Sequence, residues 1–243
     1  DYLNCSETGI TSLDVSNCTK LETLQCYDNQ LTSLNISGLT SLKEVRCERN
    51  KLTSLDVSTN TALSELYCYD NQLTSLDVNT CTLLKTLACA NNPLKNLSVV
   101  NLQSLTTLGV SDCSLLETLY CYGNQLTNLN VSGCKSLKYL SCERNKLTNL
   151  DVSTNTSLTE LHCYDNQLTS LNVSACKLLE RLGCHINQLT SLDVGNLTEL
   201  SYLSCSINKL SSLDVSRNKK LLELQCYHNE LSGLNVSSCT SLQ

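Results

Sequence analysis

Hydrophobic and polar positions recur along the chain with a period of 21 residues. Counted from Leu21, one period reads LETLQCYDNQLTSLNISGLTS, and its consensus over the chain is LxxLxCxxNxLTxLDVSxxTx. Further periods begin at Leu42, Leu63, Leu84, Leu116, Leu137, Leu158, Leu179, Leu200 and Leu221. Each period divides into a first half of ten residues, LxxLxCxxNx, and a second half of eleven residues, LTSLDVSxNTx.

Each half of the repeat predicts one short strand. The L-x-C triplet of the first half and the L-x-V triplet of the second alternate apolar and polar residues with period two, which is typical of a strand. Two strands in 21 residues leave no room for a helix. We therefore expect residues 1–243 to form a single, mainly β solenoid, with two short parallel strands per turn, no or almost no α-helix, and a rise of about 4.8 Å per turn.

The period breaks once, because residues 105–115 are a second half that directly follows another second half. Residues 10–31 align without a gap with residues 105–126, which indicates duplication of a 95-residue block. A coil can continue across such a junction only if the two halves are interchangeable, one on each side of a flattened turn. We therefore predict that first halves lie on one face up to Cys89 and on the opposite face from Cys121 onward, without a bulge.

An asparagine column follows the first strand, at position 9 of the repeat. If these amides point inward, they can hydrogen-bond the backbone of neighbouring turns, at about 1 kcal/mol for each bond. The alternative is a row of turn-forming asparagines at the surface. The column comprises Asn29, Asn50, Asn71, Asn92, Asn124, Asn145, Asn166, Asn187, Asn208 and Asn229.

The 17 cysteines fall in two columns, at positions 6 and 19, which we expect to face inward. Their odd number and the absence of a CxxC or Cys/His spacing argue against a complete disulfide framework or a zinc site. We interpret them as small apolar packing residues, although neighbouring thiols about 4.8 Å apart lie within disulfide range. Position 6 holds Cys5, Cys26, Cys47, Cys68, Cys89, Cys121, Cys142, Cys163, Cys184, Cys205 and Cys226, and position 19 holds Cys18, Cys81, Cys113, Cys134, Cys176 and Cys239.

The pattern LxxLxCxxNxL is similar to the leucine-rich repeat signature, whose Asn/Cys position is filled here by Asn at position 9 and by Cys or Asn at position 19. The resemblance covers essentially the whole chain. The nested halves resemble a bacterial 21-residue subclass sometimes called IRREKO, and they depart from the internalin-like type in having Cys where the strand normally carries its second Leu. The resemblance implies a binding module that contacts its partner through outward strand positions.

The outward positions of the first half are the most variable ones, and they carry our candidate binding residues. Tyr and Arg frequently anchor interfaces because they combine a wide apolar area with a polar tip. The alternative is that tyrosine simply suits exposed strands. The candidates are Tyr27, Arg46, Glu48, Tyr67, Tyr69, Tyr120, Tyr122, His162, Tyr164 and Tyr227, with Arg144 beside them.

Composition narrows the classes of partner. The net charge of −6 gives no basic stripe for nucleic acid or anionic lipid, and no apolar run is long enough for membrane insertion. No HExxH, GxSxG, P-loop or Rossmann pattern occurs, so we expect no enzyme. His162 and His185 lie on consecutive turns. We interpret their proximity as coincidence, the alternative being that they share a metal ion. We expect no cofactor, the alternative being Ca²⁺ along the outward aspartates Asp56/Asp77 and Asp193/Asp214.

These observations predict a non-catalytic module for binding or adhesion to a protein or glycan, within a secreted or cell-surface bacterial protein. The alternative is a structural protein that self-associates end to end into fibres through open solenoid ends. The location is itself open to two interpretations. Abundant reduced cysteine suits the cytoplasm, whereas the repeat subclass resembles exported proteins.

Overall fold

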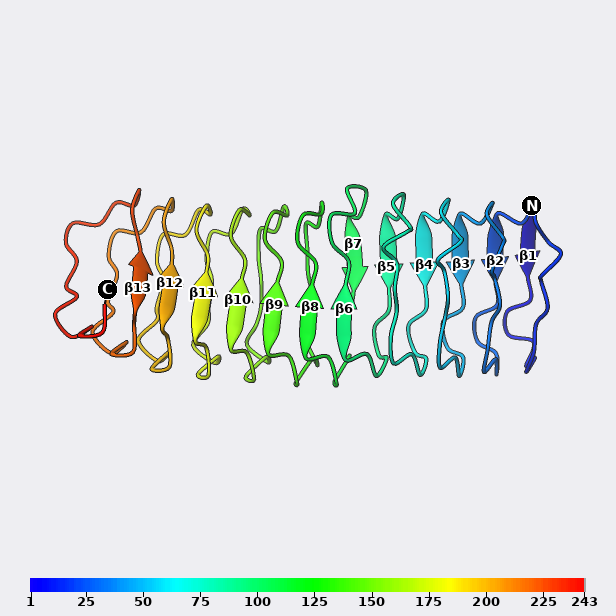
Figure 1. The fold of residues 1–243 in the computed structure, drawn as a ribbon, viewed down its shortest axis with the longest axis horizontal. Coiled ribbons are helices and arrows are strands. Elements are labelled where there is room, and N and C mark those ends of the chain that lie inside the picture. The colour runs from blue at the N-terminus through cyan, green and yellow to red at the C-terminus, as the bar shows by residue number, and fades with distance from the viewer. Residues whose placement is uncertain (243) are drawn as a thin grey trace.

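The computed structural model, which describes residues 1–242, is a rod of stacked turns with the two termini at opposite ends (Figure 1). It is a parallel β-solenoid of about 11 turns, and no helix occurs among the described residues, as the repeat pattern predicts. Each of the thirteen strands is three residues long. They are β1 (Tyr2–Asn4), β2 (Thr23–Gln25), β3 (Glu44–Arg46), β4 (Glu65–Tyr67), β5 (Thr86–Ala88), β6 (Asn96–Ser98), β7 (Thr107–Gly109), β8 (Thr118–Tyr120), β9 (Tyr139–Ser141), β10 (Glu160–His162), β11 (Arg181–Gly183), β12 (Tyr202–Ser204) and β13 (Glu223–Gln225).

The strands form two parallel sheets, with the orders β1-β2-β3-β4-β5-β7 and β13-β12-β11-β10-β9-β8-β6. Paired residues lie one repeat apart, so that Leu3 is opposite Leu24 and Leu161 is opposite Leu182. Each inward residue therefore stacks on the inward residue of the next turn, leucine on leucine except at Val45 of β3. A one-residue slip would turn that entire set outward, which explains why the register is fixed.

The extra second half at residues 105–115 is accommodated because first and second halves change places between the two sheets. Strand β5, from a first half, pairs with β7 from the lone second half, and β6, from the preceding second half, pairs with β8. The backbone bonds are regular there, with Cys89 N–H donating to the Gly109 carbonyl at 2.8 Å. First halves therefore occupy one sheet up to β5 and the other from β8 onward, which confirms the predicted change of face.

The prediction of two strands in every turn is wrong for most second halves. Among the second halves within residues 1–242, only β6 and β7 are strands, and the others pair at most through single bridges such as Asp14 with Asn35. In most second halves, the Asp or Asn at position 15 accepts a hydrogen bond from the backbone two residues on, as in Ser58 N to Asp56 Oδ1 at 2.9 Å. This local bond competes with a strand ladder. In β6 and β7 the same position holds Ser98 and Gly109 instead.

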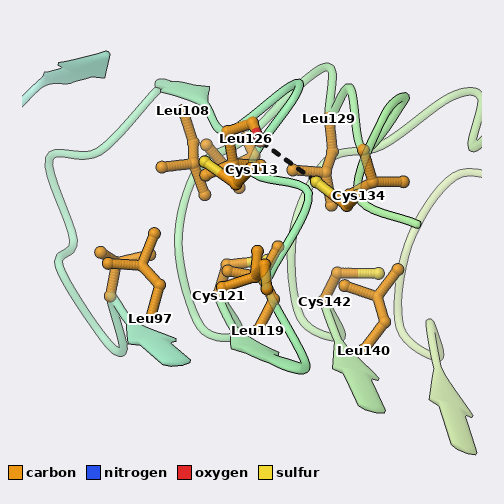
Figure 2. Close-up of a cluster of buried hydrophobic side chains, with 14 of the residues drawn as sticks. Leu97, Leu108, Cys113, Leu119, Cys121, Leu126, Leu129, Cys134, Leu140 and Cys142 are labelled. Carbon is orange, nitrogen blue, oxygen red and sulfur yellow. Dashed lines mark hydrogen bonds between the residues drawn. The ribbon is translucent and has the colours of Figure 1, made fainter. Parts of the chain in front are cut away.

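The interior is built from leucine, valine and cysteine. Leu97, Leu119 and Leu140 project from one sheet, and Leu108 and Leu129 project towards them from the opposite side (Figure 2). All five side chains are buried. The two walls of the flattened coil thus share one continuous hydrophobic core, which fits the alternation of the L-x-C and L-x-V triplets.

The asparagines at position 9 point inward and join the turns, as predicted. Asn50 is representative of this column. Its Nδ2 donates to the carbonyls of Cys26 and Cys47 at 3.0 and 3.1 Å, and its Oδ1 accepts the Leu31 N–H at 2.9 Å. Each amide therefore satisfies backbone groups that the strand ladder leaves unpaired.

The cysteines face inward with one clear exception, and all 17 are free thiols. Cys18 is exposed, because it lies in the first described turn with no turn stacked on its outer side. Position 19 does more than fill space, which packing alone did not predict. Cys134 Sγ donates to the Val110 carbonyl at 3.2 Å, and Asn60 Nδ2 donates to the Ile36 carbonyl at 3.0 Å. Cys and Asn at this position therefore add a bond to the backbone of the preceding turn, whereas Leu39, Leu102 and Leu197 in the same column only fill the interior.

Candidate binding groove

The structure does not bring the ten predicted binding residues together, because the half turn divides them between two faces. One face, formed by β1–β5, carries the early candidates, and the other, formed by β8–β13, carries the later ones. The first group is Tyr27, Arg46, Glu48, Tyr67 and Tyr69, and the second is Tyr120, Tyr122, His162, Tyr164 and Tyr227. A single contact surface therefore includes at most half of them.

On the β1–β5 face, an arginine is enclosed between two tyrosines. The Arg46 guanidinium carbon lies 5.2 Å from the ring centroid of Tyr27 and 5.0 Å from that of Tyr67, within the range of cation–π attraction. Its Nη2 also pairs with Oε1 of Glu48 at 2.9 Å. Glu48 was predicted to be an outward binding residue, but only 1% of it is exposed, because Arg46 covers it as its ion-pair partner.

A second arginine on this face is also paired within the chain. Arg49 contacts Oδ2 of Asp28 at 3.1 Å and Oδ2 of Asp70 at 3.7 Å. Its guanidinium carbon lies 5.7 Å from the centroid of the Tyr69 ring. The charged side chains of this face are therefore largely committed to one another.

The opposite face contains a groove of about 450 Å³ over strands β9 to β12. Its walls come from the outward positions before, within and after these strands, so that four consecutive turns contribute to it. The lining residues are Tyr139, Glu143, Arg144, His162, Tyr164, Arg181, Gly183, His185 and Tyr202.

Gly183 keeps the floor of the groove open. A Cβ atom at this residue would lie 3.0 Å from Nδ1 of His162 and 3.6 Å from Cδ1 of Tyr164. Any side chain at Gly183, the last residue of β11, would therefore crowd these two rings. The glycine acts here through its lack of a side chain.

The walls are made of stacked rings and an arginine. Tyr164 and His185 lie face to face, with centroids 4.3 Å apart and an interplanar angle of 11°. The Arg181 guanidinium carbon lies 4.5 Å from the Tyr202 centroid. Such contacts restrict side-chain rotation, so the groove is largely shaped before a ligand arrives.

The accessible charges in the lining are mainly positive. Arg181 approaches a carboxylate only through Nε, 3.8 Å from Oε2 of Glu160, and Arg144 has no ion-pair partner within residues 1–242. Glu143 is only 8% exposed, and its Oε2 accepts a 2.8 Å hydrogen bond from Ser141.

Two other groups of the lining, His185 and Tyr139, have pKa values shifted towards the neutral form. Burial lowers the pKa of His185, which keeps its imidazole uncharged. Burial, followed by the nearby Tyr120 and Glu160, raises the pKa of Tyr139 to about 12. Arg144 and Arg181 supply the guanidinium groups of the lining.

Of the ten predicted residues, only His162 and Tyr164 line the groove. Tyr120 supports it from outside, since its ring lies 5.1 Å from that of Tyr139, whereas Tyr122 and Tyr227 are not part of the lining. The sequence-based candidates omit Tyr139, Glu143, Arg181, Gly183, His185 and Tyr202. The 95-residue offset contains the missing signal, because Thr86, Ala88 and Ala90 of the first copy correspond to Arg181, Gly183 and His185.

No three His, Cys, Asp or Glu side chains gather closely enough to hold an ion in the part of the chain that the structure describes. Asp56 and Asp214, from the column considered for Ca²⁺, each accept a local backbone hydrogen bond at 2.9 Å. No helix able to cross a bilayer is found among residues 1–242.

Comparison with known proteins agrees with this architecture. Neither a protein-family model nor a curated protein matches the sequence. Among solved structures, the functional domain of InlJ from Listeria monocytogenes, which includes a cysteine ladder, is 36% identical, with a TM-score of 0.55. That match covers 99% of this chain and 56% of the InlJ chain, so the present chain spans little more than half of its relative.

Two further bacterial structures are similar. The leucine-rich repeat protein LIC12759 from Leptospira interrogans is 28% identical, with 93% of this chain and 66% of that chain covered and a TM-score of 0.54. The internalin InlF from Listeria monocytogenes is 21% identical, with coverages of 100% and 85% and a TM-score of 0.55, and it supports the fold alone. The chain is therefore a β-solenoid with the leucine-rich repeat fold, similar to those of bacterial leucine-rich repeat proteins.

Proposed function

We propose that this chain is a non-catalytic module that binds a partner protein through the groove over β9–β12. The observation that carries the proposal is the composition of this groove. Tyrosine, arginine and histidine line it, and tyrosine and arginine are the side chains that most often dominate binding energy at protein interfaces. They lie in or directly beside the stacked strands, so that little ordering accompanies binding.

A catalytic function is less well supported by the same residues. Ser204 Oγ lies 3.1 Å from Nδ1 of His185, which is the contact expected for a nucleophile and its base. However, Ser204 is only 1% exposed and also lies 3.1 Å from Oε1 of Gln225. A substrate has no route to this hydroxyl, so the pair helps to hold the groove wall.

The binding test uses peptides selected on the protein itself. Peptides enriched from a displayed random library on the wild type would be measured against Tyr202→Ala and against Tyr27→Ala, a tyrosine on the opposite face. We expect Tyr202→Ala to weaken binding by about tenfold or more, as for an interface anchor, and Tyr27→Ala to leave it unchanged. Circular dichroism confirms that both variants remain folded.

The same two variants, Tyr202→Ala and Tyr27→Ala, also define the result that would contradict the proposal. If Tyr27→Ala abolishes binding while Tyr202→Ala does not, the binding face is the one formed by β1–β5. A parallel glycan array treats carbohydrate as the competing ligand class. Groove-dependent binding of glycans without any peptide binding would replace the protein partner by a carbohydrate.

We place the module in a secreted or cell-surface bacterial protein. The support is the resemblance to exported repeat proteins, and the free cysteines are compatible with it. Burial raises the pKa of interior thiols such as Cys47 and Cys68 well above the ordinary value, and a thiol that stays protonated reacts slowly. Proteolysis of intact cells tests this location, since a cytoplasmic protein would be protected.

Self-association is the second candidate function. The outer edges of β1 and β13 have no partner strand among residues 1–242, and apolar side chains are exposed near both, including Tyr2 at 62% and Leu234 at 41%. Unpaired strand edges favour addition of further strands. Sedimentation at rising concentration separates the two functions, because a display module stays monomeric and a fibre-former does not.

A further inference from the structure

The two copies of the duplicated block treat their arginines differently. In the first copy, Arg49 contacts Asp28 at 3.1 Å and Asp70 at 3.7 Å. Its counterpart 95 residues later is Arg144, for which Gly123 replaces Asp28. The remaining acid, Asp165, forms no ion pair with Arg144 in the described part of the chain. The guanidinium that is paired with acids in the first copy is therefore unpaired in the second copy, within the described residues.

A second guanidinium appears beside it. Thr86 of the first copy corresponds to Arg181, whose side chain is 45% exposed and stacks on Tyr202. Its terminal nitrogens have no hydrogen-bond partner within residues 1–242, since the only acidic contact is the 3.8 Å approach of Nε to Glu160. Arg144 and Arg181 both line the groove.

The acidic side chains near the groove do not form close ion pairs with these two arginines. Glu143 is only 8% exposed, and its oxygens lie 2.8 Å from the Ser141 hydroxyl and 3.5 Å from the Tyr164 hydroxyl. The Glu160 carboxylate lies outside the lining, and its Oε2 is 3.4 Å from Nε2 of His162. Neither acid forms a close, two-pronged pair with a guanidinium, which is the geometry that satisfies arginine best.

We propose that the groove binds an acidic side chain of the partner protein, with Arg144 and Arg181 supplying the guanidinium groups that hold its carboxylate. The inference rests on the proposed function and adds the chemistry that the partner must carry. A planar guanidinium matches a carboxylate through two parallel hydrogen bonds, and its stacking on Tyr202 presents that fork in a restricted orientation. The groove volume of about 450 Å³ gives the carboxylate room to enter.

The net charge of the chain makes this groove distinctive. At −6, the molecule as a whole repels acidic partners, and only a local excess of positive charge admits one. The groove therefore recognises a partner by the position of its acidic residue as well as by the charge of that residue. Binding of this kind weakens as salt screens the interaction.

The test is a titration with hexaglutamate as the probe, followed by NMR, with hexaglutamine and inorganic phosphate measured alongside. We expect the arginine Nε–H signals to shift saturably with hexaglutamate, and affinity to fall when salt is raised. Arg181→Ala is expected to weaken binding about tenfold, the scale of a lost hydrogen bond to a charged group. Arg217→Ala removes the same charge at an exposed residue outside the groove lining and is expected to have no effect.

Three results would overturn the inference. They are equal binding of hexaglutamine, equal losses in Arg181→Ala and Arg217→Ala, and binding of phosphate as tight as that of hexaglutamate. Arg181→Lys guards against a folding artefact, because it keeps the charge and is expected to retain part of the affinity. Failure of hexaglutamate alone leaves the protein-binding function standing, because the selected peptides and Tyr202→Ala test that function separately.

Discussion

Replacing Asn71 by alanine removes one rung of the inward asparagine ladder. Its Nδ2 donates to the carbonyls of Cys47 and Cys68 at 3.0 and 3.1 Å, and its Oδ1 accepts the Leu52 N–H at 3.0 Å. Asn71→Ala removes these three bonds and leaves the buried Leu52 N–H without a partner, whereas the carbonyls of Cys47 and Cys68 keep the bonds donated by Asn50 and Asn92. At about 1 kcal/mol for each lost bond, we expect the free energy of unfolding to fall by about 3 kcal/mol.

Asn229 provides a matched control within the same column. It makes the equivalent bonds, at 3.0 Å each, to the carbonyls of Cys205 and Cys226 and to the Leu210 N–H, but in a turn where it is only partly buried. Water can replace the lost amide there, so Asn229→Ala is expected to cost about 1 kcal/mol.

The assay is urea unfolding followed by far-ultraviolet circular dichroism, under reducing conditions. The free energy in water is extrapolated for the wild type and the two variants. Equal losses for Asn71→Ala and Asn229→Ala, or a loss below about 1 kcal/mol for Asn71→Ala, would refute the reasoning that the ladder holds neighbouring turns together.

Four further predictions follow from individual residues. Ile186, a β-branched residue that is 40% exposed, has a φ of 54°, so Ile186→Asn is expected to raise the free energy of unfolding in urea by about 1 kcal/mol. Native protein treated with a thiol reagent is expected to be labelled first at the exposed Cys18, and mass spectrometry identifies the site. Gly183→Ala is expected to weaken peptide binding to the groove, whereas Gly109→Ala, where a Cβ meets only ordinary contacts at 3.6 Å, leaves it unchanged. Hydrogen bonds from the hydroxyl and backbone N–H two residues on lower the pKa of Asp56 below 3.8, so their stabilisation is complete above that pH and is lost as the pH falls through the lowered value. Thermal unfolding is expected to show a smaller loss on acidification in Asp56→Asn, whose amide oxygen still accepts the backbone bond.

The sequence is sufficient to predict the path of the chain because each repeat constrains the next. Leu87 and Leu108 come from different halves, yet both present the same apolar triplet, and so the change of face at the junction follows from their equivalence. The column at position 9 likewise favours an inward side chain for Asn50, since an inward amide forms hydrogen bonds with backbone groups on two turns. Assignment to the nested 21-residue subclass stays a prediction.

The groove was harder to predict because it depends on side-chain partners and not on the period. A column of outward residues does not show that Arg46 is enclosed by tyrosines while Arg181 keeps its terminal nitrogens open. The hollow depends equally on what is missing, since a side chain at Gly183 would crowd His162 and Tyr164 in its lining. Position in the repeat predicts which way a residue points, whereas pairing among long side chains decides what remains available to a ligand.

The central claim is that the half turn exchanges the two halves, so that the copies of the duplicated block face opposite sides and only one carries the groove. Nuclear Overhauser effects between backbone protons of adjacent strands test it directly at the junction. The account predicts cross-peaks between Ala88 and Gly109, whose strands pair in register. Cross-peaks between Ala88 and Tyr120 instead would place all first halves on one face and contradict it.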